Sequence, residues 1–381
     1  MGGGRFSTAY YNASRNQGIV MYVEEIELTN WRNLEKVKLC FPEKVSVVVG
    51  DNAQGKTNFL EALFLLARGT SPRRAKDEEM IRWGEDFSYL KARFREENLY
   101  FTREVVVRKE GRKEWKRDGK REARKTILPV VAYFPHDREI VEGPPQERRD
   151  FLDEAISFLY SPYSRWLREY EKLLYRRNFL LREGASQDVV EVYGERLVNR
   201  GAQIVETRLR YLRQFVPSLQ SFYHRLSGEN TSLSVVYHSL GYRWEEGVEE
   251  GLRRAKEKTQ EEEREKRVTL FGPHRDDIVF LLQGREARGF ASQGEKKRMA
   301  VSLRLAETAL MRSIYRREIV ILVDDIFSEL DRKRRHLLWQ EIGSKGQIFL
   351  TTTEEEEIKK MRGAHSLSMF RVEGGKIEKE E

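Results

Sequence analysis

The chain has 381 residues, of which 39% are hydrophobic and 35% charged, a length and composition that suit two domains better than one. Its mean hydropathy of −0.68, with no apolar run of about 18 residues, excludes a membrane-spanning helix and predicts a soluble protein. Its 70 Lys and Arg against 62 Asp and Glu give a formal charge of +8, which favours polyanionic partners without proving one.

The first 20 residues have neither apolar periodicity nor the apolar core of a secretory signal, so residues 1–20 are predicted to be an unstructured leader before Met21. The single cysteine, Cys40, cannot form an internal disulfide, which fits a reducing, cytoplasmic location. Its apolar neighbours Leu39 and Phe41 favour a buried, inert thiol over a reactive one.

The first structured segment has the pattern of an α/β domain. Alternating apolar residues predict strands, and the continuous run at 45–49 predicts a buried strand followed by a helix that ends near Gly69. Asp118-Gly119 predicts a turn. The other predicted strands are residues 23–28, 37–41, 89–94, 99–107 and 130–134. We assign residues 21–145 to the N-terminal part of one domain.

From Gln146 apolar residues recur every three or four positions, which predicts a helix-rich arm domain over residues 146–265. The charged run 256–267 is interpreted as a solvated helix face. Residues 266–381 return to an α/β pattern, with strands at 268–271, 278–282, 319–323 and 347–350 and helices at 292–316 and 331–342. The helical domain is therefore predicted to be an insertion in an α/β domain with mixed sheets.

The segment Gly50-Asp-Asn-Ala-Gln-Gly55-Lys56-Thr57 matches every fixed position of the phosphate-binding loop, and it lies between a predicted strand and a predicted helix. Backbone N–H groups of such a loop converge on phosphate oxygens. The expected ATP contacts are Gly50, Asp51, Asn52, Ala53, Gln54, Gly55, Lys56 and Thr57. Lys56 would neutralise the β- and γ-phosphates, and the Thr57 hydroxyl would bind Mg²⁺.

Two acids, Asp324 and Asp325, follow the apolar strand at 319–323. Parallel strands present such residues at their carboxyl ends, beside the phosphate loop. Asp324 is predicted to bind Mg²⁺, and Asp325 to orient or deprotonate the attacking water as the catalytic base, with Lys56 as the second catalytic residue. Adjacent acids can also simply solubilise a strand end, but the matching phosphate loop favours the catalytic interpretation.

A third segment, Ala291-Ser-Gln-Gly-Glu295, opens the predicted helix that precedes the strand at 319–323 and its acid pair. Ser292 and Gly294 at a helix N-terminus form an anion site. By itself the segment is equally an ordinary helix cap with Glu295 in the first turn. Its position between the other two motifs supports a second contact with the γ-phosphate.

These three motifs in this order resemble the ABC-type ATPases, and more closely the RecF family. The resemblance covers roughly residues 21–372 and predicts a P-loop ABC-type ATPase head of α/β class with an inserted helix-rich domain. Beyond the phosphate loop and its continuation Asn58-Phe-Leu-Glu-Ala62, the stretches that carry it are Thr29-Asn-Trp-Arg-Asn-Leu34, Glu147-Arg-Arg-Asp-Phe-Leu-Asp153, Gly272-Pro-His-Arg-Asp-Asp277, Phe290-Ala-Ser-Gln-Gly-Glu295 and Asp324-Asp-Ile-Phe-Ser-Glu-Leu-Asp331.

The resemblance implies a DNA-binding ATPase of recombinational repair, replication and the SOS response to DNA damage. It implies a homodimer formed on ATP binding, in which Ser292 and Gly294 contact the γ-phosphate held by the partner, and slow hydrolysis. It implies single-stranded, gapped or junction DNA as substrate, with RecO and RecR as partners in loading RecA. Residues 328–331 resemble a D-loop at the dimer contact, and Arg32 is a candidate phosphate contact, with a surface role as the alternative.

The sequence departs from the wider ABC pattern at two places. Thr351-Thr-Thr353 stands where a switch histidine would follow a strand, and Pro135-His-Asp137 where a Q-loop glutamine is expected. Both departures place more of the water-orienting role on Asp325 and fit slow turnover. His274 is interpreted as a histidine that packs a turn rather than as a catalytic base.

DNA contacts should be made mainly to the phosphate backbone, because no base-reading motif is present. The basic candidates are Arg73, Arg74, Lys113, Arg176 and Arg177, with Trp115 as a stacking residue. Each could instead be ordinary solvated surface.

Two other functions remain open from the sequence. One is an energy-coupling ATPase subunit of an ABC transporter. Three features disfavour this function: the helical insertion, the Gly272–Asp277 stretch and the basic charge. The other is a DNA-binding scaffold with a vestigial ATP site, which would not need Asp325.

Overall fold

The computed structural model describes residues 21–110, 113–122, 128–228, 231–239, 247–315, 318–327, 330–343, 346–356, 358 and 367–380, so the predicted leader lies outside the described residues. Two compact units divide the chain: a first unit, Met1–His136 with Met311–Glu381, and a second unit, Asp137–Leu310. Both boundaries predicted for the arm domain, near residues 146 and 265, fall inside the second unit. No helix in the described part of the chain is long and apolar enough to cross a membrane.

The first unit contains an antiparallel sheet whose longer strands bury one face and leave the other more exposed. Its strands, in spatial order, are β2 (Leu34–Cys40), β1 (Met21–Trp31), β4 (Phe87–Glu96), β5 (Leu99–Arg108), β6 (Glu114–Arg117) and β7 (Lys120–Arg121). The prediction of a buried Cys40 is wrong: the residue is exposed, because its position in the alternation of β2 places it on the outer face.

The second sheet of the first unit is mostly parallel. Its order is β15 (Lys376–Lys379), β14 (Leu367–Glu373), β3 (Val45–Val49), β13 (Gly346–Thr352), β12 (Ile319–Asp324) and β8 (Val130–Tyr133), with only β15 antiparallel to its neighbour. β3, β12 and β13 are buried along their whole length, as expected for parallel strands with continuous apolar runs.

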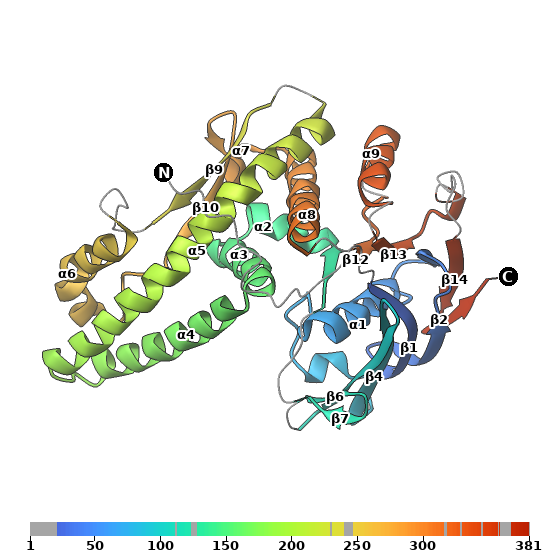
Figure 1. Cartoon of the computed structure of the whole chain (residues 1–381), viewed down its shortest axis with the longest axis horizontal. Coiled ribbons are helices and arrows are strands. Elements are labelled where there is room, and N and C mark those ends of the chain that lie inside the picture. The colour runs from blue at the N-terminus through green and yellow to red at the C-terminus, as the bar shows by residue number, and fades with distance from the viewer. Residues whose placement is uncertain are drawn as a thin grey trace. The chain divides into compact units, whose positions relative to one another are not determined.

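Helix α1 (Lys56–Arg68) packs against strands of both sheets, as Figure 1 shows in blue. Its apolar residues are buried on all sides, which is typical of a helix in the middle of a core. The two sheets are also joined by the buried Gln347 side chain of β13, which exchanges hydrogen bonds of 2.7 and 2.8 Å with the backbone N–H and C=O of Val23 in β1. Helix α9 (Arg332–Ile342) follows β12 in the chain, and a short 3-10 helix, η2 (Glu78–Met80), precedes β4.

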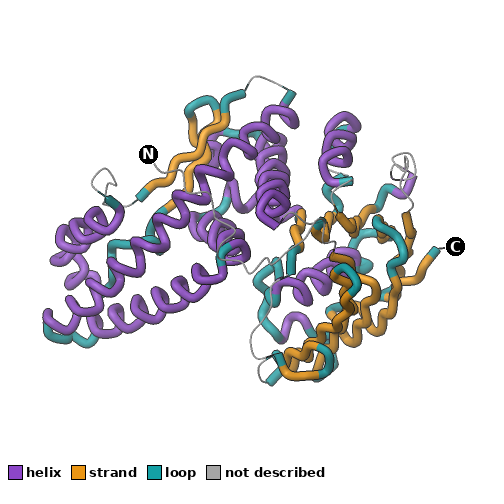
Figure 2. The backbone as a smooth tube through the Cα atoms, viewed as in Figure 1, coloured by secondary structure: helices purple, strands orange, loops and turns teal. Residues whose placement is uncertain are grey.

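The second unit is mainly helical, and its helices are the purple tubes around the three-stranded sheet in Figure 2. α4 and α5 form a long hairpin that α6 and α3 pack against. The helices are α2 (Glu139–Glu142), α3 (Pro145–Leu159), α4 (Ser161–Arg182), α5 (Gln187–Ser227), α6 (Val248–Lys266), α7 (Ala287–Phe290) and the start of α8 (Gln293–Tyr315), preceded by η3 (Pro135–Arg138). The sheet order is β11 (Arg285–Glu286), β10 (Asp277–Leu282) and β9 (Leu233–His238).

The strand predicted at residues 268–271 is wrong. Side chains, rather than a neighbouring strand, satisfy the backbone there: Asn178 Oδ1 accepts from Thr269 N at 2.8 Å, and Glu263 Oε1 accepts from Leu270 N at 2.7 Å. The strands β9, β14 and β15 were not predicted. β9 pairs with β10 inside a region whose dominant pattern is helical.

Candidate nucleotide-binding site

The phosphate loop joins β3 to α1 in a backbone conformation that needs its glycines. Gly55 has φ 120°, and Ala53 has φ 65°. A Cβ on Gly50 would lie 2.5 Å from the Val372 carbonyl oxygen, and a Cβ on Gly55 would lie 2.8 Å from Leu34 Cδ2. The loop can therefore approach β14 and β2 only with glycine at both positions, and it leads into the N-terminus of α1, where free N–H groups attract anions.

Lys56 is folded over this loop. Its buried ammonium donates hydrogen bonds to the carbonyl oxygens of Gly50 and of Asp51, the second at 2.9 Å. Burial lowers the pKa of Lys56, while the carboxylates of Asp325, Asp324 and Asp51 act in the opposite direction. These contacts hold the cation at the mouth of the loop, where phosphate oxygens would replace the carbonyls.

Asp324, at the end of β12, lies beside the first turn of α1. Its Oδ1 accepts hydrogen bonds from Thr57 Oγ1 at 3.0 Å and from Thr351 Oγ1 at 2.7 Å. Burial raises the pKa of Asp324, and the two threonine hydroxyls oppose that rise. The next residue, Asp325, has φ 49° and donates its backbone N–H to the Thr351 carbonyl at 3.1 Å. The structure thus brings together the four residues Lys56, Thr57, Asp324 and Asp325.

The donors at this point suit Mg²⁺. A threonine hydroxyl and a carboxylate are hard oxygen ligands, and in phosphate-loop enzymes the remaining positions are filled by nucleotide phosphates and water. Among the described residues no cluster of three or more His, Cys, Asp or Glu could hold a metal ion. A site that relies on the nucleotide for the rest of its ligands does not require such a cluster.

The stretch 29–34 supports the phosphate loop from outside. Trp31 Nε1 donates to the Asn58 carbonyl at 2.6 Å, Asn58 Nδ2 donates to Asn33 Oδ1 at 2.8 Å, and Asn33 Nδ2 donates to the Ala53 carbonyl at 3.2 Å. The sequence interpretation gave a role to Arg32 alone. Asn33, Trp31 and Asn58 were missed, although all three belong to stretches that carried the family resemblance.

Arg32 holds α1 rather than the loop. Its guanidinium makes a bidentate ion pair with the fully buried Glu61, at 2.7 and 3.0 Å, and donates to the Glu79 carbonyl at 2.7 Å. Glu61 also accepts from the Ser71 hydroxyl. A phosphate contact by Arg32 would require the guanidinium to leave this pair, and it stays a prediction.

Ser292 and Glu295 form a reciprocal cap at the start of α8. The Ser292 N–H and hydroxyl each donate to Glu295 Oε2 at 2.7 Å, and Glu295 N donates back to Ser292 Oγ at 3.3 Å. These hydrogen bonds lower the pKa of Glu295. Ser292 and Gly294 are exposed. The helix-cap geometry is present, and the predicted contact with a partner's nucleotide is untested.

The structure also shows the residues at the expected Q-loop position and in part of the D-loop-like segment. His136 stacks on Phe134, with ring centroids 5.1 Å apart, where a Q-loop glutamine was expected. Of the D-loop-like segment, Ser328 and Glu329 lie outside the described residues, while Asp331 caps α9 by accepting from Arg334 N at 2.9 Å.

His274 packs a turn, as predicted. Its side chain is half-buried, and Nδ1 lies 2.7 Å from the Tyr170 hydroxyl. A Cβ on the neighbouring Gly272, which has φ 109°, would lie 2.3 Å from the same hydroxyl. Burial lowers the pKa of His274 to about 4, so the ring is neutral near pH 7.

The predicted DNA contacts divide into exposed and buried residues. Arg73, Arg74 and Arg176 are exposed, whereas Lys113 is largely covered and pairs with Asp77 at 2.8 Å. The predictions for Arg177 and Trp115 are wrong. Arg177 is 2% exposed and pairs with buried Glu263, and Trp115 is 5% exposed beneath Arg103. Helical spacing explains the first error, because adjacent residues on a helix point in different directions.

Two of the family-like stretches contact each other inside the second unit. Arg148 makes a bidentate ion pair with Asp277 at 2.7 and 2.9 Å, and Arg149 donates to the Asp276 carbonyl at 2.8 Å. Asp153 pairs with the buried Arg208, which in turn donates to the Pro273 carbonyl at 2.8 Å. The charged side chains of the stretches 147–153 and 272–277 therefore hold the second unit together through these contacts.

A family model described as the RecF/RecN/SMC N terminal domain matches residues 22–378. The DNA replication and repair proteins RecF of Bacillus velezensis and Bacillus pumilus are each 34% identical to this chain, over 94% of it and 100% of their own lengths. The chain belongs to the RecF family. The predicted family is therefore confirmed, and its members are DNA replication and repair proteins.

Solved structures agree with this membership. The structure of the recombination mediator protein RecF-ATP in the RecFOR pathway is 30% identical, with a TM-score of 0.86 over 95% of this chain and 98% of that chain. An Smc head domain from Pyrococcus furiosus, 16% identical with a TM-score of 0.55 over 94% of this chain and 96% of that one, shares the fold. The predicted α/β ABC-type ATPase head with mixed sheets and a helix-rich insertion is confirmed.

Proposed function

We propose that this RecF-family chain is a Mg²⁺-dependent ATPase whose ATP-bound homodimer holds single-stranded, gapped or junction DNA and acts with RecO and RecR in loading RecA. The observation that carries the proposal is the cluster at the end of β12. There Asp324 Oδ1 lies 3.0 Å from Thr57 Oγ1 of the phosphate loop, and Lys56 caps the same loop. ATP is the proposed nucleotide because a solved RecF relative carries it.

Each residue of the cluster has a separate part in hydrolysis. The backbone N–H groups of residues 50–57 and the Lys56 ammonium bind the phosphates and offset their charge. Thr57 and Asp324 would hold Mg²⁺, which supplies electrostatic stabilisation of the phosphate oxygens. Asp325 accepts the proton of a water whose oxygen bonds to the γ-phosphorus, while the bond from that phosphorus to the β,γ-bridging oxygen breaks and ADP leaves.

The remaining contact with the γ-phosphate would come from a second copy of the chain. Ser292 and Gly294 are exposed at the N-terminus of α8, where free N–H groups and the helix dipole favour an anion. A site that needs Ser292 of the partner is complete only in the dimer, so hydrolysis follows dimerisation. Slow turnover is expected because neither a switch histidine nor a Q-loop glutamine stands at the matching positions.

DNA binding by the exposed arginines Arg73, Arg74 and Arg176 would be electrostatic. We expect affinity to fall steeply with salt and to change little with base sequence. An affinity that stays flat between low and moderate salt would contradict this part of the proposal.

Size analysis by light scattering tests the proposal directly, with and without ATP, Mg²⁺ and a gapped DNA duplex. The expected result is a monomer without ATP and a DNA-bound dimer with ATP and Mg²⁺. Lys56→Ala should remain a monomer in every condition, and Lys38→Ala, which removes an exposed cation of β2, should behave like the wild type. A wild-type chain that stays monomeric with ATP and DNA overturns the proposed dimer.

Mixed dimers test the shared site. A Lys56→Ala chain and a Ser292→Ala chain each lack one half of every complete site, but together they form one intact site per mixed dimer. Partial recovery of ATP hydrolysis on mixing supports a site built from two chains, whereas activity that only averages the two variants contradicts it.

A further inference from the structure

A cavity of about 440 Å³ lies in the second unit, away from every motif assigned above. It is lined by the end of α4, the turn that joins α4 to α5, the start of α5 and the end of α6. Leu181, Ala185 and Val190 supply an aliphatic part of its wall. The arginines Arg182, Arg264 and Arg267 stand at its exposed margin.

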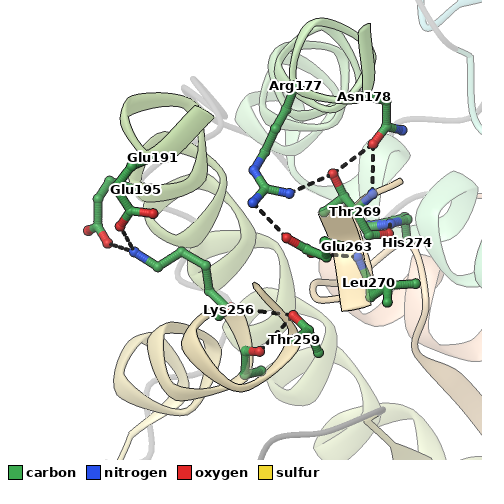
Figure 3. A network of polar contacts seen from close by, with 11 residues as sticks. Arg177, Asn178, Glu191, Glu195, Lys256, Thr259, Glu263, Thr269, Leu270 and His274 are labelled. Carbon is green, nitrogen blue, oxygen red and sulfur yellow. Dashed lines mark hydrogen bonds and ion pairs between the residues drawn. The ribbon is translucent and has the colours of Figure 1, made fainter. Parts of the chain in front are cut away.

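One buried ion pair and two half-buried ones brace the wall of this cavity (Figure 3). Arg177 Nη2 pairs with Glu263 at 2.7 Å, and its Nη1 donates to Thr269 Oγ1 at 3.0 Å, which joins α4 to the end of α6. Lys256 of α6 pairs with Glu191 and Glu195 of α5. Because these contacts already fix the cavity wall, few of its side chains need to be ordered when a ligand binds. The entropy cost of binding is therefore small, which favours binding.

The charge left over around the cavity is positive. Of the carboxylates that line it, Glu263 is paired with Arg177, and Glu191 with Lys256. Among the described residues that line the cavity, Glu183 is the one carboxylate left to offset the arginines at its margin. In the described part of the chain Arg182, Arg264 and Arg267 make no side-chain hydrogen bond or ion pair, and the N-terminus of α5 adds further positive potential at Gln187.

We propose that this cavity binds an acidic peptide segment of a partner protein, with one apolar side chain of the segment on the aliphatic wall and its carboxylates on Arg182, Arg264 and Arg267. Gln187 and Gln260 offer both donors and acceptors to the peptide backbone. A single-stranded nucleic acid fits less well, because the described residues that line the cavity include no aromatic ring to stack on a base. The inference does not depend on the ATP site.

The probes are fluorescein-labelled pools of eight-residue peptides made of Asp and Glu with one Leu, Ile, Val or Phe at varied positions. We expect saturable binding of this pool to the full chain by fluorescence anisotropy. Binding should weaken at least about tenfold in the double variant Arg264→Glu/Arg267→Glu, since each arginine contributes a charged hydrogen bond. Lys258→Glu, an exposed charge reversal on α6 outside the cavity, should leave binding unchanged.

Two comparison pools separate the alternatives. A pool with the same apolar residues and Lys in place of the acids should not bind, and an acid-only pool should bind more weakly. No saturable binding of the acidic–apolar pool, or equal binding by the double variant, overturns the proposal. Binding of a labelled oligo-dT that the double variant loses, without peptide binding, assigns the cavity to nucleic acid instead. ATP binding by the double variant should remain normal, which keeps this test separate from that of the ATPase.

Discussion

The hydroxyl of Thr57 donates a 3.0 Å hydrogen bond to Asp324, a residue 267 positions later in the chain. Strand β13, which lies between β3 and β12 in the sheet, brings the two residues together. β13 pairs with β3 on one side and with β12 on the other, and in that register Thr351 lies opposite Asp324. Thr351 then donates its own hydroxyl to the same carboxylate oxygen at 2.7 Å. One of the three threonines that stand where a switch histidine would follow is therefore part of the site.

Replacing Thr351 by valine should weaken ATP binding about tenfold, because one charge-assisted hydrogen bond to Asp324 is lost. It should also change the pH profile. Burial raises the pKa of Asp324 and the threonine hydroxyls oppose that rise, so the pKa should rise further in Thr351→Val. Binding of Mg²⁺ and ATP needs the ionised carboxylate, so affinity should begin to fall at a higher pH than in the wild type.

The measurement for Thr351→Val is titration with a fluorescent ATP analogue and Mg²⁺ across the acid range. Thr353→Val is the matched control, because Thr353 is exposed two residues further on. Superimposable acid limbs for the two variants would show that the Thr351 hydroxyl does not tune Asp324.

Asp325→Asn should bind ATP normally and accumulate as an ATP-bound dimer, with hydrolysis reduced at least about a hundredfold by loss of the base. The change should not strain the backbone, because Asp325 has φ 49° and asparagine tolerates that region well. Asp118→Asn makes the same change at φ 51° in the β6–β7 turn, where it should leave hydrolysis unaffected. Single-turnover hydrolysis at the wild-type rate by Asp325→Asn would remove Asp325 from the mechanism.

The sequence predicted the parts of the fold that repeat a strong local signal. Continuous apolar runs marked β3 and β12, and the motif spacing placed Lys56, Thr57, Asp324 and Asp325 on the correct elements. The contribution of Asn33 was not predicted, because it holds the loop through a side-chain amide whose partner is a backbone carbonyl 20 residues away. Such a contact leaves no periodic pattern in the chain.

The errors at Arg177 and Trp115 arise because a charged and an aromatic residue are buried. Arg177 and Trp115 have residue types that usually lie at the surface or stack on bases, and sequence alone does not show that Glu263 and Arg103 cover them. The strand predicted at 268–271 fails for a related reason, since the carboxylate of Glu263 and the amide of Asn178 replace a strand partner.

Replacement by alanine should have very different effects on the free energy of unfolding at the neighbours Arg176 and Arg177. Arg177→Ala leaves the Glu263 carboxylate buried without its cation, which should lower the free energy of unfolding by about 3–5 kcal/mol. Arg176→Ala should change stability by less than about 0.5 kcal/mol, because the side chain is exposed. If Arg176 contacts DNA, its loss should weaken binding to all sequences alike and reduce the salt dependence by about one phosphate contact.

Urea unfolding and DNA titration at several salt concentrations measure both effects. The double variant Arg177→Met/Glu263→Leu serves as control, because removing both charges should recover much of the lost stability. Equal stabilities for the two alanine variants would contradict the burial of the Arg177–Glu263 pair.

The half-buried His274 should make the second unit less stable as the pH falls. Its pKa is about 4 in the folded chain, against 6.5 for an exposed histidine, because burial and the nearby Arg275, Arg149 and Arg208 disfavour the charged ring. Between these two values the unfolded chain binds a proton that the folded chain does not, so stability should fall from pH 6.5 to pH 4 and then level off. The total effect is roughly 3 kcal/mol.

Urea unfolding followed by circular dichroism, at several pH values in this window, should give a steeper loss of stability for the wild type than for His274→Gln, because glutamine does not titrate. Carboxylates titrate equally in both chains and cancel in the comparison, so parallel pH profiles would mean that the folded protein accepts the proton on His274 without cost.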